Sequence, residues 1–152
     1  MEIRFENKVA FITGAAGGIG YAAARMFAEA GASVVMVDLD GQITARAKEL
    51  EAEGHDAIGI RCDVSDEAQV KAAVEKAVAV FGKLDIAYNN VGIHAAVRED
   101  LAETEGWDFD RVISVNLRGV WNCMKYELVE MKKHGKGAIV NCSSQGLSLI
   151  HI

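Results

Sequence analysis

The stretch T-G-A-A-G-G-I-G at residues 13–20 decides the fold. It directly follows the apolar, strand-like run Val9–Thr13 and opens a helical pattern. Glycines at such a junction permit a tight turn, let the backbone approach a pyrophosphate, and point a helix N-terminus at that negative charge. Asp38 ends the next strand-like run, 18 residues after Gly20 (38 − 20), where an acidic side chain can bind a ribose. This order predicts a dinucleotide site, the alternative being that Asp38 is a solvated turn residue beside Asp40.

Short apolar runs recur along the whole chain. Runs of this kind are typical of strands buried on both faces of a parallel sheet. The segments expected to be strands are Val9–Thr13, Ser33–Asp38, Ala57–Cys62, Leu84–Tyr88 and Ala138–Cys142.

Helical patterns separate these runs. Apolar residues recur at helical spacing, and a glycine follows each of the first three patterns as a stop signal. The expected helical positions are Ile19, Ala22, Ala23, Met26, Phe27 and Ala30 before Gly31; Ile43, Ala47 and Leu50 before Gly54; Val70, Val74, Ala77 and Phe81 between the candidate N-cap Ser65 and Gly82; and a long pattern over Trp107–His134. The alternation predicts an α/β fold with a Rossmann-like, doubly wound parallel sheet.

Composition narrows the classes of partner. The chain has 152 residues, 51% of them apolar, and its 16 Lys+Arg against 22 Asp+Glu leave a net charge of −6. An acidic chain of this kind disfavours nucleic-acid and anionic-membrane binding. The longest apolar run, Ala77–Phe81, has five residues, whereas a membrane-spanning helix needs about 20. We therefore expect no nucleic-acid partner, no membrane contact and, given the polar start Met1–Lys8, a cytoplasmic location.

The cysteines and histidines do not suggest a metal centre. Cys62, Cys123 and Cys142 lack the CxxC spacing of a zinc site, and each lies in an apolar or strand-like segment. We expect all three to be small buried hydrophobic residues. The four histidines lie far apart and share no metal-ligand spacing, so no metal site is predicted.

Five motifs between Lys8 and Gly146 resemble, in order, those of the short-chain dehydrogenase/reductase family. The glycine stretch matches the fingerprint T-G-x-x-x-G-x-G, and Asp63-Val64 matches a D-V pair that contacts adenine in the family. The segment N-N-V-G at residues 89–92 resembles the family's N-N-A-G, with valine in place of alanine. V-N-L-R-G around Asn116 and G-A-I-V-N-C-S-S at residues 137–144 resemble its active-site helix and the strand that leads to its catalytic serine.

The resemblance implies a role for each matching residue. The residues implied to bind the cofactor are Thr13, Gly14, Gly18, Ile19, Gly20, Asp38, Asp63, Val64, Asn90 and Gly92. The implied catalytic residues are Asn116, which would hold a proton-relay water, and Ser144, which would hydrogen-bond the substrate oxygen. The implied reaction is a nicotinamide-dependent hydride transfer between a secondary alcohol and a ketone. A homo-oligomer is expected of a full-length relative rather than of this chain.

Purely structural roles are the alternative for several of these residues. Asp63 could cap the helix that begins near Ser65, and Asn89 and Asn90 could be turn residues that bond their own backbone. Asn116 lies four residues after Val112 and three before Gly119, on an apolar helical stripe. A buried asparagine there would have to be hydrogen-bonded.

The chain departs from the family pattern in one respect that bears on catalysis. The family's Y-x-x-x-K pair, whose tyrosine is the general acid/base, is missing: none of Tyr21, Tyr88 and Tyr126 has a lysine four positions on. We expect an incomplete dinucleotide-binding domain over residues 1–147, truncated after the fifth strand, and a tail of doubtful origin over 148–152. Three hypotheses follow: a NAD-dependent oxidoreductase lineage that is inactive as this fragment, a nucleotide-binding module without turnover, or a non-functional truncated product.

Overall fold

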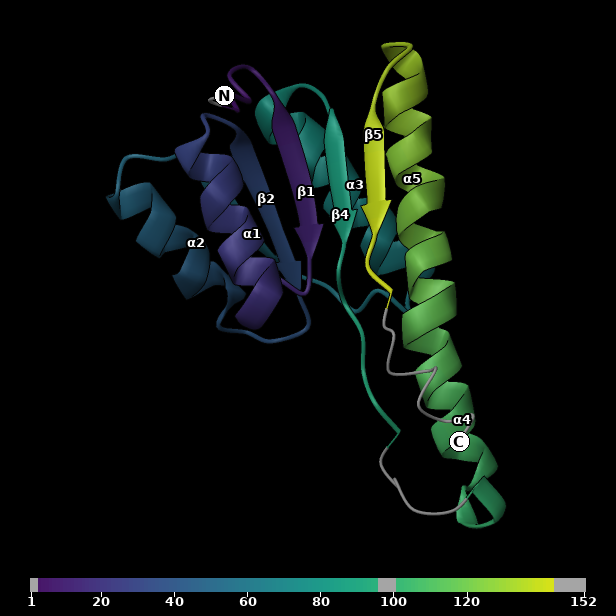
Figure 1. Ribbon diagram of the computed structural model, residues 1–152. Coiled ribbons are helices and arrows are strands. Elements are labelled where there is room, and N and C mark those ends of the chain that lie inside the picture. The colour runs from purple at the N-terminus through teal and green to yellow at the C-terminus, as the bar shows by residue number, and fades with distance from the viewer. Residues whose placement is uncertain (1–2, 96–100, 144–152) are drawn as a thin grey trace.

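The computed structural model describes residues 3–95 and 101–143. Figure 1 shows a parallel sheet flanked by helices. The elements are β1 (Val9–Thr13), α1 (Gly18–Glu29), β2 (Ser33–Asp38), α2 (Ile43–Ala52), β3 (Ala57–Arg61), α3 (Glu67–Phe81), β4 (Ile86–Asn89), a 3₁₀ turn (Leu101–Glu103), α4 (Gly106–Ile113), a π-helical segment (Ser114–Gly119), α5 (Val120–Lys133) and β5 (Ala138–Asn141). The five strands pair in parallel in the order β3-β2-β1-β4-β5. The predicted α/β fold is confirmed, and the strand order reverses between β1 and β4.

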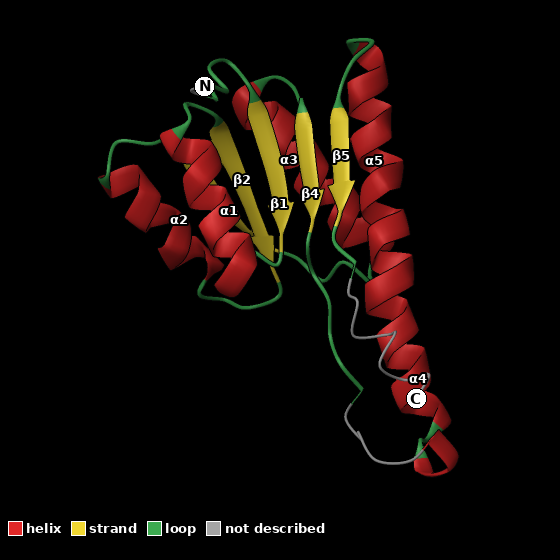
Figure 2. Cartoon of the chain, viewed as in Figure 1, coloured by secondary structure: helices red, strands yellow, loops and turns green. Residues whose placement is uncertain are grey.

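The sheet separates two apolar cores, because successive side chains of a strand point to opposite faces. Ala10 and Ile12 of β1 pack with α1 and α2, whereas Val9 and Phe11 pack with α3 and α5. Figure 2 shows these helices on the two sides of the strands. Every residue of β1 is buried, which explains its continuous apolar sequence.

The fourth strand begins two residues later than predicted. The prediction was Leu84–Tyr88, and β4 is Ile86–Asn89. Asp85, just before this start, bonds β1 through both its backbone and its side chain: its amide donates to the Val9 carbonyl at 3.1 Å, and its Oδ2 accepts the Val9 amide at 3.0 Å. The Val9 amide thus bonds a carboxylate instead of a backbone carbonyl, and the regular ladder begins at the next residue. Lys8 and Lys83 form ion pairs with the same carboxylate. Asp85 thereby fixes the amino end of β4 against β1.

The helix that follows the glycine loop presents a different face to the sheet from the one predicted. The buried residues of α1 are Gly20, Ala24 and Ala28, whereas Ile19 and Met26 of the predicted stripe are 69% and 70% exposed. A Cβ on Gly20 would lie 2.0 Å from the Gly14 carbonyl oxygen. The helix therefore packs so closely that its innermost positions hold only small residues, while Phe27 is partly buried at the side of the core and Ile19 and Met26 are exposed.

The predicted helix stops are confirmed, and one predicted cap is wrong. Gly31, Gly54 and Gly82 have φ values of +92°, +93° and +80°, in the left-handed region that favours glycine. The N-cap of α3 is Asp66 rather than Ser65, and its carboxylate accepts the amides of Ala68 and Gln69. The neighbouring Ser65 instead donates its hydroxyl to Asp63.

The long C-terminal helical pattern predicted over Trp107–His134 is present as three consecutive segments. The π-helical residues Ser114–Gly119 separate α4 from α5. Gly119 within this segment is buried against Val64, and a Cβ there would lie 2.6 Å from the Val64 Cγ2. No helix among the described residues has the length and apolar character that crossing a membrane requires.

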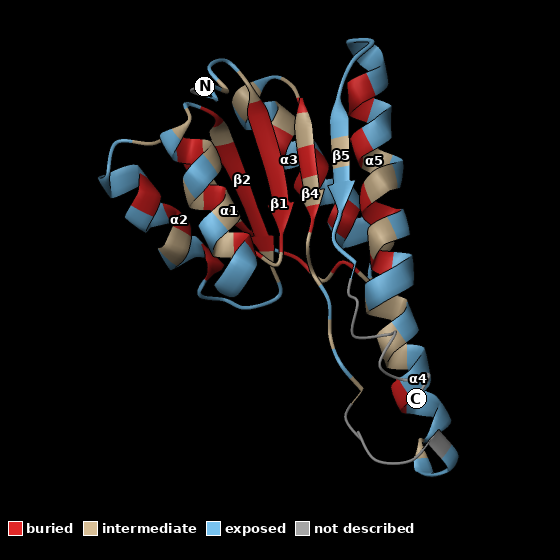
Figure 3. Cartoon of the chain, viewed as in Figure 1, coloured by how far each residue is buried: buried red, intermediate tan, exposed pale blue. Residues whose placement is uncertain are grey.

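The last strand forms an edge of the described sheet. Three of the four residues of β5 are exposed, as Figure 3 shows by colour, and Val140 is 56% exposed. Cys142, which follows β5, is exposed, so the prediction that all three cysteines are buried is wrong for this one. The reason is its place at the sheet edge, since Cys62 and Cys123 lie in the core between the sheet and the helices.

Candidate functional site

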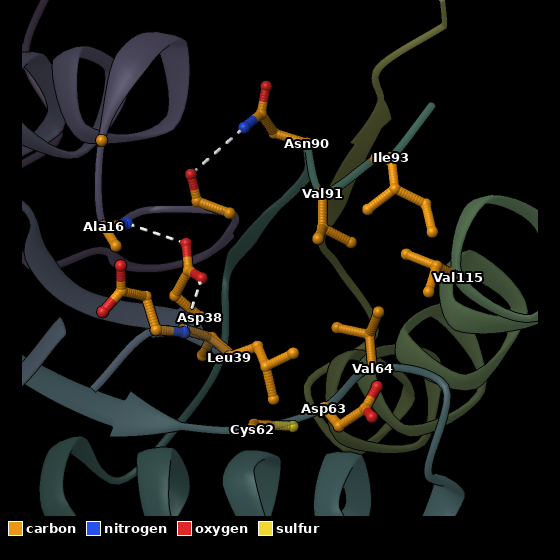
Figure 4. Close-up of a pocket in the computed structure, with 15 residues that line it drawn as sticks. Ala16, Asp38, Leu39, Cys62, Asp63, Val64, Asn90, Val91, Ile93 and Val115 are labelled. Atoms are coloured by element: carbon orange, nitrogen blue, oxygen red, sulfur yellow. Dashed lines mark hydrogen bonds between the residues drawn. The ribbon is translucent and has the colours of Figure 1, made fainter. Parts of the chain in front are cut away.

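A pocket of about 670 Å³ opens at the carboxyl ends of the strands, on both sides of the point where the strand order reverses. This is where open parallel α/β sheets bind their ligands. Its lining comes from the loops after β1, β2, β3 and β4 and from the π-helical segment (Figure 4). The lining residues are Gly14, Ala16, Gly17, Val37, Asp38, Leu39, Asp40, Cys62, Asp63, Val64, Asn90, Val91, Gly92, Ile93 and Val115.

The glycines of the loop after β1 fall into two groups. Gly14, with φ +67°, is tightly packed, because a Cβ there would lie 3.0 Å from Asn90 Nδ2 and 3.1 Å from Val91 Cα. Gly20 is more restricted still, because a Cβ there would lie 2.0 Å from the Gly14 carbonyl oxygen. In contrast, a Cβ on Gly17 or Gly18 would meet no atom within 4 Å. Gly14 and Gly20 thus let the loop and α1 pack closely together, whereas Gly17 and Gly18 border open space.

The N-terminus of α1 lies beside this space and has no side-chain cap among the described residues. Its N-cap is Gly17, which has no side chain, and the first turn of α1 contains no acidic residue. The N-cap of α3, by comparison, is satisfied by Asp66. An uncapped helix N-terminus has free amide groups and a positive dipole end, which favour an anion. These residues therefore fit a pyrophosphate group.

Asp38 lies at the end of β2 on the pocket wall. Its Oδ2 accepts the Ala16 amide at 3.0 Å, and its Oδ1 accepts the Asp40 amide at 3.0 Å (Figure 4). The carboxylate thus joins the glycine loop to the turn after β2. Arg61, which the sequence analysis did not select, donates its Nε to the Leu39 carbonyl on the same turn.

Asp63 and Val64 line the pocket after β3. The Asp63 Oδ1 accepts both the amide and the hydroxyl of Ser65, at 2.9 and 2.7 Å. The sequence left open that Asp63 caps the helix near Ser65. Asp63 does not cap α3, but its hydrogen bonds to Ser65 order the turn before that helix. Cys62 beside it has a thiol whose pKa is raised by burial to about 12, so it contributes a neutral surface.

Asn90 and Gly92 also line the pocket. The Asn90 Nδ2 donates to the Gly14 carbonyl at 3.4 Å, and the amides of Asn90 and Val91 donate to the Thr13 Oγ1 at 3.0 and 3.2 Å. Thr13 is buried and does not line the pocket. Its hydroxyl instead holds the loop after β4 against the end of β1. Gly18, Ile19 and Gly20 likewise lie outside the pocket lining.

Asn116 is exposed rather than buried on the predicted apolar stripe. Its Oδ1 accepts the Ile93 amide at 2.9 Å, and its Nδ2 donates to the Ile93 carbonyl at 2.8 Å. The π-helical segment rotates the following turn, so the periodicity of a regular helix does not apply here. The Asn116 side chain thereby holds the pocket loop in place at Ile93. Ser144, the other predicted catalytic residue, lies outside the described residues.

A second contact that holds the loop after β4 was not predicted. Arg111 of α4 donates Nη2 to the His94 carbonyl at 2.7 Å and forms an ion pair with the fully buried Asp108. The spacing of Asp108 and Arg111, three residues apart on one helix face, was visible in the sequence. The hydrogen bond from Arg111 to the His94 carbonyl could not be seen in the sequence, because it depends on where the loop after β4 lies. Ile93 and Val115 were missed for the same reason.

Comparison with known proteins identifies the family. The fold makes the chain a Rossmann-like α/β protein with a pocket at the switch point of its sheet. The sequence description of the short chain dehydrogenases matches residues 8–148. The chain belongs to the short-chain dehydrogenase/reductase family, as its motifs predicted.

Three relatives illustrate the similarity. The chain is 44% identical over 140 residues to cis-4-hydroxycyclohexanecarboxylate dehydrogenase of Sinomonas cyclohexanicum, covering 92% of this chain and 56% of that protein. It is 41% identical over 142 residues to the mitochondrial borneol dehydrogenase of Lavandula x intermedia, covering 93% and 53%. It is 42% identical over 147 residues to cyclohexanol dehydrogenase of Acinetobacter sp. (strain SE19), covering 95% and 57%. The chain spans about half the length of these relatives.

Proposed function

We propose that this chain binds NAD as the nucleotide-binding part of an oxidoreductase that interconverts a secondary alcohol and a ketone. The observation that carries the proposal is the pocket at the switch point, with the uncapped N-terminus of α1 on one side and Asp38 on the other. The open space over Gly17 and Gly18 would receive the pyrophosphate. Asp63 and Val64 would border the adenine.

Selectivity for NAD over NADP is proposed from the charges around Asp38. NADP carries an additional phosphate on the ribose that Asp38 would bind, and Asp40 lines the same part of the pocket. Two like unit charges ~4 Å apart repel by about 4 kcal/mol at an effective dielectric of 20. Leu39 stands where a cation would be needed to offset this repulsion. The Arg61 guanidinium donates its Nε to the Leu39 carbonyl at 3.0 Å.

Calorimetric titration with NAD and NADP tests this selectivity. The chain is expected to bind NAD more tightly, and Asp38→Asn, which removes one charge, is expected to reduce the difference. Asp56→Asn is the matched control, since this exposed residue directly precedes β3 at the opposite end of the strands. Equal affinity of the unmodified chain for the two cofactors would contradict the assignment of Asp38.

In the reaction, the bound nicotinamide would supply or accept the hydride, and the protein would supply orientation and electrostatics. Asn116 would keep the loop at Ile93 in place beside the cofactor, because both polar atoms of its side chain bond that residue. We propose that Ser144 hydrogen-bonds the substrate oxygen and that Asn116 lies near a proton-relay water. The relatives named for cyclohexanol, a hydroxycyclohexane carboxylate and borneol favour ring-shaped alcohols as the substrates to try first.

A second candidate function is nucleotide binding without turnover by these 152 residues. The observation that favours it is that no tyrosine in the sequence has a lysine four positions on, and a positioned general acid/base contributes about 10²–10⁴-fold. Calorimetry with NAD and a turnover assay with NAD and a panel of ring alcohols distinguish the candidates. Binding without turnover supports the second, turnover refutes it, and absence of binding refutes both.

A further inference from the structure

A carboxyl group lies buried on α5, outside the pocket. Glu127 has no exposed surface. Its Oε2 accepts one hydrogen bond, from Asn89 Nδ2 at 3.0 Å. Its Oε1 is also buried and has no hydrogen-bond partner among the described residues, and the same is true of Asn89 Oδ1. The contact between Glu127 and Asn89 therefore contains two buried acceptor oxygens that have no donor among the described residues.

The ionised form of this carboxyl group is strongly disfavoured by its surroundings. A buried carboxylate needs a cation or several hydrogen bonds, and within residues 3–95 and 101–143 Glu127 has one hydrogen bond and no ion pair. Burial raises the pKa of Glu127 to about 7, and the Asn89 hydrogen bond opposes this only in part. A proton on the carboxyl group would remove the charge and provide the missing donor.

Within the described part of the chain, no ion pair of Glu127 offsets its charge. On α5, one turn earlier, the Cys123 thiol has a pKa raised by burial, and beyond it lies the Cys62 thiol. One turn later Glu130 is paired with Lys133. β4 and β5 contribute the neutral amides of Asn89 and Asn141.

From α3, the side chain that reaches this part of α5 is also engaged. Glu67 bonds Lys125 and Tyr126, so its charge is already paired. The charged side chains named on α3 and α5 are therefore each paired with groups other than Glu127.

The Asn89 amide connects this carboxyl group to the pocket. Asn89 is the last residue of β4, and its Nδ2 also donates to Asn141 Oδ1 at the end of β5, at 3.0 Å. The next two residues, Asn90 and Val91, form a wall of the pocket. Glu127 is thus linked to the proposed nucleotide site by its hydrogen bond to Asn89 and by the peptide bond from Asn89 to Asn90.

We propose that Glu127 is a positioning residue whose neutral, protonated form holds α5 against the ends of β4 and β5, and that nucleotide binding is coupled to this protonation. Ionisation would draw water into the contact and loosen the wall at Asn90 and Val91. By thermodynamic reciprocity, a nucleotide that needs the ordered wall favours the protonated form. This inference rests on the proposed nucleotide binding.

Calorimetry of NAD binding as a function of pH tests the coupling. The affinity of the unmodified chain is expected to fall about threefold to tenfold between about pH 6 and pH 8, since one proton permits at most a tenfold change per pH unit. Titration in two buffers of different ionisation enthalpy is expected to show proton uptake on binding near neutral pH. Glu127→Gln, whose amide can both accept from and donate to Asn89, should bind NAD without this pH dependence.

Glu130→Gln is the matched control, because this residue is nearly buried on the same helix but is paired with Lys133. It is expected to retain the pH dependence of the unmodified chain. A wild-type affinity that is independent of pH, or an equal pH dependence in Glu127→Gln, overturns the coupling.

Carboxyl NMR of the glutamate-labelled, unmodified chain without nucleotide gives an independent measurement. The resonance assigned to Glu127 is expected to titrate near neutral pH, and a midpoint at the ordinary value of glutamate overturns the inference. If that resonance titrates as expected but NAD does not bind at any pH, the proposed function has failed and the coupling fails with it, while the neutral state of Glu127 is upheld.

Discussion

Residues 14–20 show how one amino-acid type meets two different requirements within a single loop. Gly14 and Gly20 allow contacts of 3.0 Å or less that a Cβ would occupy, whereas Gly17 and Gly18 border open space. The sequence motif does not separate these requirements. Substitutions at the individual positions therefore have different expected outcomes.

Gly20→Ala is expected to destabilise the fold. The added Cβ would lie 2.0 Å from the Gly14 carbonyl oxygen, which is backbone and cannot rotate away. Overpacking of this kind costs about 1–3 kcal/mol, occasionally more. Urea denaturation measures the loss, with Gly17→Ala as the control, since that position is open and has an extended φ of −165°. An equal loss of stability in the two variants would refute the close packing of α1.

Gly18→Val is expected to abolish nucleotide binding. The branched side chain would occupy the open space at the N-terminus of α1 where the pyrophosphate is proposed to lie. Gly18 also has φ +53°, so part of any effect is backbone strain. Gly54→Val controls for that strain, because Gly54 has φ +93°, borders open space and lies after α2. Calorimetry with NAD should show binding in the control only; retained affinity in Gly18→Val would remove the loop from the site.

Among the elements, α3 depends on its N-cap in a way that α2 does not. Asp66→Ala removes a carboxylate that accepts the amides of Ala68 and Gln69, and loss of such a cap costs about 0.5–2 kcal/mol. Gln42→Ala is the comparison, since the N-cap of α2 makes no side-chain hydrogen bond. Thermal unfolding of the two variants should show a lower Tm for Asp66→Ala and an unchanged Tm for Gln42→Ala. The reverse order would mean that Asp66 does not cap α3.

The contact between α5 and β4 gives stability a pH dependence of known sign. The pKa of Glu127 is raised from 4.5 to about 7 in the folded chain, so the folded state holds the proton more tightly than the unfolded state. The stabilisation is complete below pH 4.5 and is lost as the pH rises through about 7. We expect the chain to lose up to about 3 kcal/mol relative to Glu127→Gln over this window. Parallel urea titrations measure the difference, and a difference that is constant with pH would contradict it.

At the scale of the whole molecule, the exposed edge of the described sheet is expected to promote self-association. Val140 of β5 is 56% exposed on an edge strand, which presents unpaired backbone groups to other chains. Val140→Lys is expected to reduce aggregation in light scattering. Val80→Lys is the control, because Val80 is similarly exposed, at 51%, but lies on α3. Equal solubility gains from both variants would point to net charge rather than to the strand edge.

Local patterns in the sequence determined the five strands, their helical connections, the glycine loop and the acid at the end of β2. The strands are short continuous apolar runs, the helices repeat every 3.6 residues, and the loop and the acid follow them directly, so all can be recognised without knowing what lies opposite. The hydrogen bond from the glycine loop to Asp38 was not predicted, and it forms because the carboxyl ends of adjacent parallel strands meet at one edge of the sheet.

The tertiary structure decided which face of α1 is inward, how Asn116 is used and where the buried carboxyl group lies. Each depends on contacts between distant segments: Gly20 on Gly14, Asn116 on Ile93 and Glu127 on Asn89. Glu127 appears in the sequence as an ordinary charged residue of a helix, and only the packing of α5 over β4 removes it from water. Periodicity describes one segment at a time, whereas burial and hydrogen bonding are set by the segment that packs against it.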